Sequence, residues 1–250
     1  MNSSHPGERI DDLLINNLKI IQHEREFRFS LDAVLLAHFA TVRPGAAVVD
    51  LGTGTGVIGL LLTALGAGRV TGVEINPQMA ELAQRSVQLN KLEHQVGIIH
   101  ADFRQLKGVL PSGQWELVVA NPPYRPIGRG LINPSDAVAS ARHEITADLA
   151  DVVQAARYLV KYRGRFAMIH IPERMVEVLS AMSRAGIEPK RLRLVYPAAD
   201  KKPKLMLVEG VRGAKSGLDV LPPLVVYDKQ GDYTAEIRAY YPELAKEVID

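Results

Sequence analysis

The chain has 250 residues and a mass of 27.4 kDa, enough for one large α/β domain. It contains 47% hydrophobic residues, no cysteine and no apolar run near the roughly 20 residues of a membrane-spanning helix, which excludes disulfides, thiolate metal sites and a membrane span. The net charge of +2 does not by itself indicate a nucleic-acid binder. Because the N-terminal stretch MNSSHPGERIDD lacks the apolar core of a signal peptide, we expect a cytoplasmic protein.

In chain order, the first predicted element is a short helix within residues 27–40, capped by Ser30. Strands and helices then alternate. Strands are expected at 46–52, 69–75, 95–103, 115–123 and 164–172, and helices at 56–66, 77–92, 149–160 and 174–186. Residues 191–197 and 203–212 are predicted to pair as a hairpin at the edge of the sheet. This pattern predicts one doubly wound α/β domain whose mostly parallel sheet carries helices on both faces.

A glycine-rich loop, VVDLGTGTGVIG, joins the first strand of this series to the first helix. The spacing of Gly54, Gly56 and Gly59 matches the dinucleotide fingerprint, and Glu74 ends the next strand at the required distance. A carboxylate at that place accepts hydrogen bonds from ribose hydroxyls. The loop therefore fits two cofactors, a nicotinamide dinucleotide or S-adenosylmethionine.

Two further acids favour S-adenosylmethionine. Asp50, two residues before the first glycine, would repel a pyrophosphate but attract the ammonium and sulfonium of S-adenosylmethionine. Asp102 follows the third strand, where it could accept a hydrogen bond from an adenine amine. Three acids at three successive strand ends are thus predicted to bind the cofactor.

The stretch ANPPYRP follows the apolar run WELVVA, and its prolines end that strand because they supply no N–H to the sheet. An amine conjugated to a base or an amide is a poor nucleophile, and acceptors that hold both of its N–H groups would direct its lone pair toward a methyl group. The Asn121 side-chain oxygen and the Pro122 carbonyl are such acceptors, Pro122 and Pro123 hold them in place, and Tyr124 can stack on a flat substrate. This chemistry requires no metal.

The motifs VVDLGTGTG, GVEIN, ADF and NPPY occur in the order and spacing found in class I Rossmann-like methyltransferases, which residues 45–175 resemble. The resemblance implies a seven-stranded sheet with an antiparallel edge strand. We expect an N-terminal extension with a capping helix at 1–44, the methyltransferase domain at 45–215 and a C-terminal tail at 216–250 that packs on the domain. The cofactor-binding residues that the resemblance implies are Asp50, Gly52, Thr53, Gly54, Gly56, Glu74, Ile75, Asp102, Phe103 and Asn121.

The flanking motifs FRFSLDAVLLAHFA and SARHEIT, with KKPKLMLVEG, resemble the bacterial tRNA adenine-N6 methyltransferases over about residues 11–211. Those enzymes modify the adenine just 3′ of the anticodon of a valine tRNA. The resemblance implies that Phe29, Ser30 and Asp32 lie near the cofactor or the target base. It also implies that Arg142 and His143 border the substrate entrance.

Basic residues concentrate between positions 184 and 215, where nine Lys or Arg stand against three acids. We expect this segment to contact tRNA phosphates, with Arg125 and Arg129 after NPPY adding to it. The lysines placed in the substrate site are Lys201, Lys202 and Lys204. Three alternatives stay open at this point: a methyltransferase for a protein glutamine amide, one for adenine in ribosomal RNA or DNA, and a nicotinamide-dependent oxidoreductase.

Overall fold

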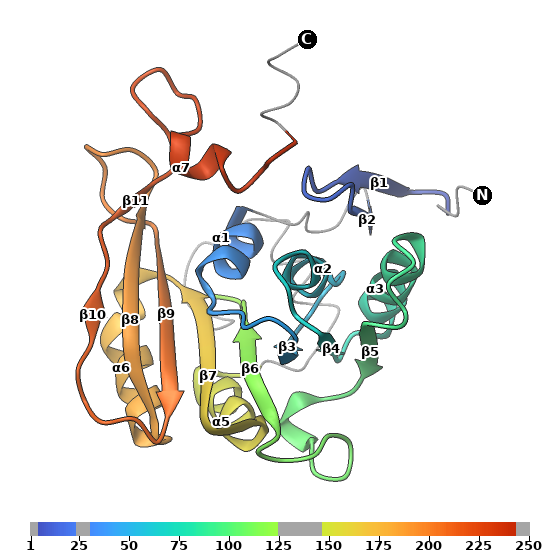
Figure 1. Cartoon of the computed structure of the whole chain (residues 1–250), viewed down its shortest axis with the longest axis horizontal. Coiled ribbons are helices and arrows are strands. Elements are labelled where there is room, and N and C mark those ends of the chain that lie inside the picture. The colour runs from blue at the N-terminus through green and yellow to red at the C-terminus, as the bar shows by residue number, and fades with distance from the viewer. Residues whose placement is uncertain (1–4, 24–30, 125–146, 244–250) are drawn as a thin grey trace.

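The structure, a computed structural model, describes residues 5–23, 31–124 and 147–243. Within these residues one large sheet runs through the molecule, with its strands in the order β10-β8-β9-β7-β6-β3-β4-β5 and β11 also paired to β8 (Figure 1). Its strands are β3 (Ala47–Leu51), β4 (Arg69–Glu74), β5 (Val96–His100), β6 (Trp115–Ala120), β7 (Val160–His170), β8 (Ile187–Tyr196), β9 (Leu205–Arg212), β10 (Asp219–Val220) and β11 (Leu224–Val225).

Helices flank both faces of the sheet, and all but the first of them connect parallel strands. They are α1 (Leu31–Phe39), α2 (Val57–Ala64), α3 (Pro77–Leu89), α5 (Leu149–Leu159) and α6 (Met175–Arg184), with the 3-10 turns η1 (Phe103–Gln105) and η2 (Pro172–Arg174). Local sequence sets their ends: Asn76 caps α3 ahead of Pro77, and Gly186, at φ 72°, follows α6. The four helices predicted after residue 45 are confirmed, as is the helix within 27–40.

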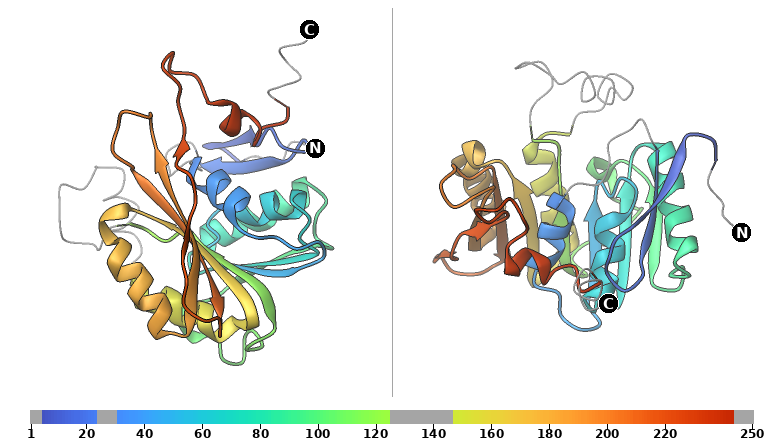
Figure 2. Two further views of the ribbon diagram at one scale, coloured as in Figure 1. Left: turned by 60° about the vertical axis from the view of Figure 1, so that its left-hand side comes forward. Right: turned by 90° about the horizontal axis from the view of Figure 1, so that it is seen from above.

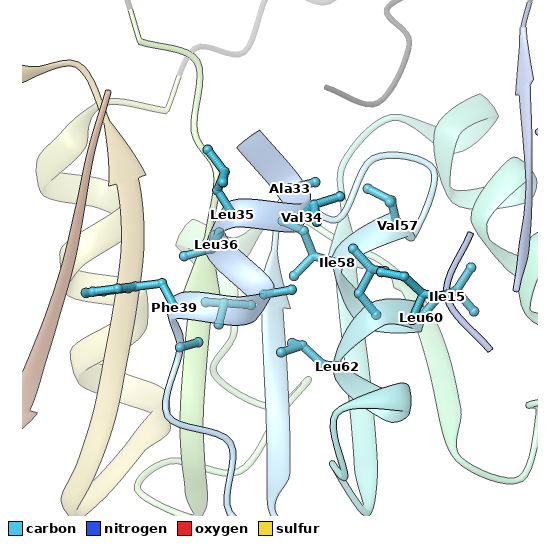
Figure 3. Packing of buried hydrophobic residues seen from close by; sticks show 14 of the residues in the cluster. Ile15, Ala33, Val34, Leu35, Leu36, Phe39, Val57, Ile58, Leu60 and Leu62 are labelled. Atoms are coloured by element: carbon cyan, nitrogen blue, oxygen red, sulfur yellow. The ribbon is translucent and has the colours of Figure 1, made fainter. Parts of the chain in front are cut away.

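Alternation along the strands produces two separate cores. Val48 and Val119 face a cluster that includes α1 and α2, whereas Val49 and Val118 face a cluster that includes α5 and α6. Figure 3 shows the first cluster, in which apolar side chains of α1 pack against those of α2. Because both faces are covered, the central strands are almost continuously apolar.

The predicted fold class is confirmed, with a difference in where the antiparallel strand lies. β8 and β9 do form the expected antiparallel hairpin, but β9 is inserted between β7 and β8, antiparallel to both. It is therefore an inner strand and not an edge strand. The short strands β10 and β11 pair in parallel with β8 and extend the sheet beyond the seven strands expected.

The N-terminal extension contains a hairpin that the sequence analysis did not predict: β1 (Glu8–Asp12) and β2 (Lys19–His23), paired antiparallel. It packs on α3, where the N–H of Ile21 donates to Ser86 Oγ at 3.0 Å and Arg85 pairs with Glu8 at 2.7 Å. The buried side chain of Ile15, between the two strands, joins the α1–α2 core (Figure 3).

The C-terminal segment lies beside α1 and extends toward the N-terminal hairpin (Figure 2). After β11 it forms the short helix α7 (Ala235–Arg238), and the Tyr240 ring stacks on His38 of α1 with centroids 4.2 Å apart. Glu243 then accepts a hydrogen bond from the N–H of Asn17 at 2.7 Å. The C-terminal segment therefore contacts both α1 and the turn of the N-terminal hairpin. No helix of the described ranges has the length and apolarity needed to cross a bilayer.

Candidate active site

The predicted site residues lie along one edge of the sheet because strands β3 to β6 are parallel and end together (Figure 1). In the register of the sheet, Leu51 is opposite Ala120, and Glu74 is opposite His100. The segments that follow these residues are therefore neighbours: the glycine loop, Ile75, Asp102 and the NPPY motif. Ligands bind outside the carboxyl ends of strands in open α/β sheets.

The conformation of the glycine loop is set by glycines with positive φ angles and by hydrogen bonds to Glu74. Gly52 and Gly54 adopt positive φ angles of 69° and 57°, and a Cβ on either would meet no atom within 4 Å, so both face open space. Glu74 accepts the N–H of Gly54 and the N–H of Asn76, each at 2.8 Å. Gly56 instead lies close to Ala83 of α3, which leaves little room for a side chain.

Asp50 is fully buried beneath this loop. Its Oδ2 accepts the Thr53 hydroxyl at 2.6 Å, while Oδ1 makes no hydrogen bond to the part of the chain that the structure describes. Burial is the main cause of a pKa of about 7 for Asp50; the hydrogen bond from the Thr53 hydroxyl opposes this rise, the Glu74 carboxylate adds a smaller increase, and the Gly59 N–H a smaller decrease. A cation next to Oδ1 would reverse that shift.

The residues after β4 and β5 form the next part of the site. The backbone oxygen of Ile75 lies 3.0 Å from His100 Nε2, within hydrogen-bond distance. Asp102 caps η1 and pairs with Arg104 at 2.6 Å, and the hydrogen bonds from Arg104 lower the pKa of Asp102. Phe103 packs, partly buried, on the α5–α6 core. Arg104 thus already engages the carboxylate that we expected to receive an adenine amine.

The NPPY motif follows β6 directly, and its tyrosine turns inward. The Tyr124 hydroxyl lies 2.5 Å from Asp32 Oδ2 and 3.1 Å from Asn121 Oδ1. Burial and the Asp32 carboxylate raise the pKa of Tyr124 well above its usual value, so the hydroxyl stays protonated. Asn121 and Pro122 are partly buried and Pro123 is exposed.

His170, at the end of β7, is the neighbour of this tyrosine on the next strand. The two rings have centroids 5.5 Å apart and are tilted by 53°. Burial, followed by the charge of Arg174, lowers the pKa of His170 to about 4, so the ring is neutral at pH 7. His170 lies within the strand predicted at 164–172, and a polar side chain at the end of an apolar strand is the pattern that also marks Asn121.

Several predicted substrate residues lie outside the described ranges: Phe29, Ser30, Arg125, Arg129, Arg142 and His143. Lys201, Lys202 and Lys204 are described, and all three are exposed in the loop between β8 and β9. Since β8 is parallel to β7, this loop lies at the same edge of the sheet as the NPPY motif.

Other cations of the basic segment have partners within the chain, and contact of the segment with phosphates stays a prediction. Arg191 contacts the buried Glu209 at 3.3 Å and lies over the Phe39 ring. Arg193 pairs with Glu236 at 2.6 Å, and Arg212 donates to the Val160 carbonyl. Sequence alone cannot separate such paired arginines from free ones, because their partners are distant in the chain.

Comparison with known proteins decides between the two cofactor classes that the glycine loop allows. The model of the methyltransferase small domain family matches residues 31–162, more than half of the chain. The chain belongs to this methyltransferase family. The match includes the glycine loop, Asp32 and the NPPY motif, and it gives no support to the oxidoreductase alternative.

Among characterised relatives, the methyltransferase is similar to proteins named tRNA1(Val) (adenine(37)-N6)-methyltransferase. The one from Porphyromonas gingivalis is 29% identical over 219 residues, which cover 84% of this chain and 85% of that protein. The one from Cronobacter sakazakii is 29% identical over 188 residues, 74% of each chain. A relative of the same name from a Flavobacteriaceae bacterium is 27% identical over 191 residues, 70% of this chain and 79% of its own.

Solved structures share the methyltransferase fold. The crystal structure of a predicted O-methyltransferase from Agrobacterium tumefaciens superimposes with a TM-score of 0.68 at 22% identity, covering 85% of this chain and 96% of its own. The ribosomal protein L11 methylase of Lactobacillus delbrueckii reaches a TM-score of 0.54 at 17% identity, over 75% and 81% of the two chains. At these identities the likeness establishes the fold alone.

Proposed function

We propose that this methyltransferase transfers a methyl group from S-adenosylmethionine to N6 of an adenine in tRNA, and specifically to adenine 37, just 3′ of the anticodon of valine tRNA. The observation that carries the proposal is the Asn121–Tyr124 site at the end of β6. It is supported by relatives that match most of the chain and are named for this activity. A cytoplasmic location, where tRNA is found, belongs to the same proposal.

S-adenosylmethionine fits the residues at the glycine loop. The unpartnered Oδ1 of buried Asp50 suits an ammonium group, because a cation there would offset the cost of burying the carboxylate. Gly52 and Gly54 leave space against the loop, and Glu74 retains acceptor capacity for ribose hydroxyls beside the two N–H groups it already binds. When bound, the cofactor supplies a methyl group made electrophilic by its sulfonium. Thr53, Gly56, Ile75, Asp102 and Phe103 complete the proposed cofactor site.

The chain itself positions the acceptor amine. Asn121 Oδ1 and the Pro122 carbonyl would accept the two N–H groups of adenine N6, which directs the nitrogen lone pair away from the ring and stabilises the positive charge that develops on nitrogen. The prolines fix the backbone that carries both acceptors. Tyr124 would hold the flipped base by stacking, next to the neutral His170 ring.

The tRNA would be bound by the catalytic domain, with Lys201, Lys202 and Lys204 contacting phosphates. Their loop supports this role because it is exposed and lies at the same edge of the sheet as NPPY. Arg125, Arg142, His143 and Phe29 belong to the proposal through the family resemblance alone.

The test is transfer of labelled methyl from S-adenosylmethionine into total tRNA that lacks its native modifications, followed by nucleoside analysis. The proposal predicts N6-methyladenosine, located at adenine 37 of valine tRNA when purified species are compared. An adenine-37-to-guanine transcript of that tRNA is the matched control, since it keeps the purine and replaces the amine at position 6 by a carbonyl oxygen. Label in a protein amide or in ribosomal RNA, with none in tRNA, would refute the proposed substrate.

A further inference from the structure

The Tyr124 hydroxyl faces two acceptors but carries one proton. Asp32 Oδ2 lies 2.5 Å away and Asn121 Oδ1 lies 3.1 Å away. A carboxylate is the stronger acceptor, and a short hydrogen bond to an ionised group is roughly twice as strong as one between neutral groups. The proton is therefore donated to Asp32, and Asn121 Oδ1 is left available.

Asp32 is well placed to remain the acceptor. It lies in the first turn of α1, where the helix dipole favours a negative charge, and no other acidic side chain stands in that turn. The following residues of α1, from Ala33 to Ala37, are buried in the core with α2, so the carboxylate projects from a fixed element. Its hydroxyl partner stays protonated at neutral pH because burial opposes ionisation of Tyr124.

We propose that Asp32 is a positioning residue for methyl transfer: by accepting the Tyr124 proton, it fixes the tyrosine ring and keeps Asn121 Oδ1 free for an N–H of the target amine. The inference deepens the proposed function and rests on it, because it assumes that Asn121 receives an amine. It differs from the role that the family resemblance implies, since Asp32 acts here through Tyr124 and not by contacting cofactor or base.

Loss of the carboxylate would alter the site in a defined way. Without Asp32, the remaining acceptor within reach of the Tyr124 hydroxyl among the described residues is Asn121 Oδ1. The tyrosine would then occupy the acceptor that the substrate amine needs. The ring would also lose its hydrogen bond to α1, and its position would then depend on the Asn121 contact and on the tilted contact with the His170 ring.

The experiment is a double-mutant cycle of Asp32→Ala and Tyr124→Phe. Asp32→Ala should lower kcat about 10- to 100-fold, the range expected for a lost hydrogen bond to a charged group that misplaces a reacting group. The Kd of S-adenosylmethionine, measured by calorimetry, should change by less than about twofold. The double variant should be no slower than Tyr124→Phe alone, because Asp32 has no role once the hydroxyl is gone.

Two control variants match these changes. Asp219→Ala removes an exposed carboxylate on β10, and Tyr162→Phe removes a hydroxyl from a tyrosine that is 69% exposed on β7. Both should retain wild-type kcat. If Asp32→Ala does not fold by circular dichroism, Asp32→Asn replaces it in the same cycle, with a smaller loss because the amide oxygen still accepts the hydroxyl.

Three results would overturn the inference: wild-type kcat in the Asp32 variant, multiplicative losses in the double variant, or a weaker Kd for S-adenosylmethionine. A wild-type protein that is inactive on tRNA refutes the proposed substrate instead. In that case the same cycle can be measured by the unfolding equilibrium constants of the four proteins. Their coupling still shows whether Asp32 holds Tyr124, because it does not depend on which substrate is methylated.

Discussion

Glu74 and Gly54 are joined by a hydrogen bond of 2.8 Å in which the backbone N–H of the glycine donates to Oε2 of the carboxylate. The bond links the end of β4 to the loop that follows β3, and the second carboxylate oxygen binds the N–H of Asn76 at the start of α3. Glu74 therefore shapes the loop in addition to its proposed contact with the ribose.

Glu74→Ala should weaken S-adenosylmethionine binding about 10- to 100-fold. The change removes the charged acceptor of two backbone N–H groups and the carboxylate proposed to bind the ribose hydroxyls. Isothermal calorimetry measures the effect directly. Glu93→Ala, which removes an exposed carboxylate after α3, is the control and should bind normally. Unchanged affinity in the Glu74 variant would contradict the assigned role of the loop.

The raised pKa of Asp50 predicts a pH-dependent stability. An acid whose pKa in the folded state is about 7, against 3.8 ordinarily, binds more protons when folded, so it lowers stability as pH rises from about 4 to 7. Asp50→Asn should remove that slope and raise the free energy of unfolding at pH 8 by up to about 4 kcal/mol. Urea unfolding of both proteins at pH 5 and pH 8 checks the sign; an unchanged difference between the two pH values would refute it.

Ionisation of Asp50 should also make cofactor binding depend on pH. Affinity for the cofactor is expected to rise with pH, whereas stability falls. If the ammonium of S-adenosylmethionine pairs with ionised Asp50, affinity should fall as the pH drops below about 7. Calorimetric titrations between pH 6 and 8.5 test this, with Asp50→Asn as the variant in which the dependence should disappear. A flat profile in the wild-type protein would remove Asp50 from the ammonium site.

We expect removal of the Glu209 carboxylate to lower the free energy of unfolding strongly without acting on the candidate site. Its fully buried carboxylate accepts Arg165 at 2.8 Å, Arg191 at 3.3 Å and the N–H of Thr41 at 2.7 Å, which ties three strands to the segment after α1. Glu209→Ala should cost about 3–5 kcal/mol, since it leaves two cations partly buried without their partner. The pair of exposed Glu177 and half-buried Arg174 is the comparison, because Glu177→Ala should cost under about 1 kcal/mol in the same urea unfolding experiment.

Charge reversal at Lys201, Lys202 and Lys204 should weaken tRNA binding and reduce its dependence on salt, because each lost phosphate contact lowers the slope of log K against log salt by about 1. Filter binding at several salt concentrations measures both quantities. Reversal at Arg43, Arg69 and Lys107, which are exposed at or near the amino ends of the strands, is the matched control. Equal effects from the two triple variants would assign the loss to net charge and not to the β8–β9 loop.

Much of the fold follows from local sequence. The strands from β3 to β7 and their helices were predicted because apolar runs and amphipathic segments alternate between glycines and prolines, as at Pro77 and Gly186. The N-terminal hairpin was missed because its strands are short and polar on one side. Its stability comes from α3, through Ser86 and Arg85, which no local pattern reveals.

Part of the candidate site could also be predicted from local sequence, because polar residues at the ends of apolar strands can be recognised there. Asp50, Glu74 and Asn121 end apolar strands, and parallel strands bring such ends together. The contact of Tyr124 with Asp32 joins two segments 92 positions apart, and the pairing of Asp102 with Arg104 depends on side-chain conformation. Neither is encoded in spacing, so both required the structure.

The stacking of Tyr240 on His38 has a consequence for how the enzyme is made. Helix α1, which carries Asp32, is synthesised well before the aromatic ring that packs on the helix near its C-terminal end. Contacts between such distant positions form late and slow folding. During synthesis, α1 therefore lacks this contact until the segment around Tyr240 has been made, although the glycine loop and the NPPY motif are already present in the nascent chain.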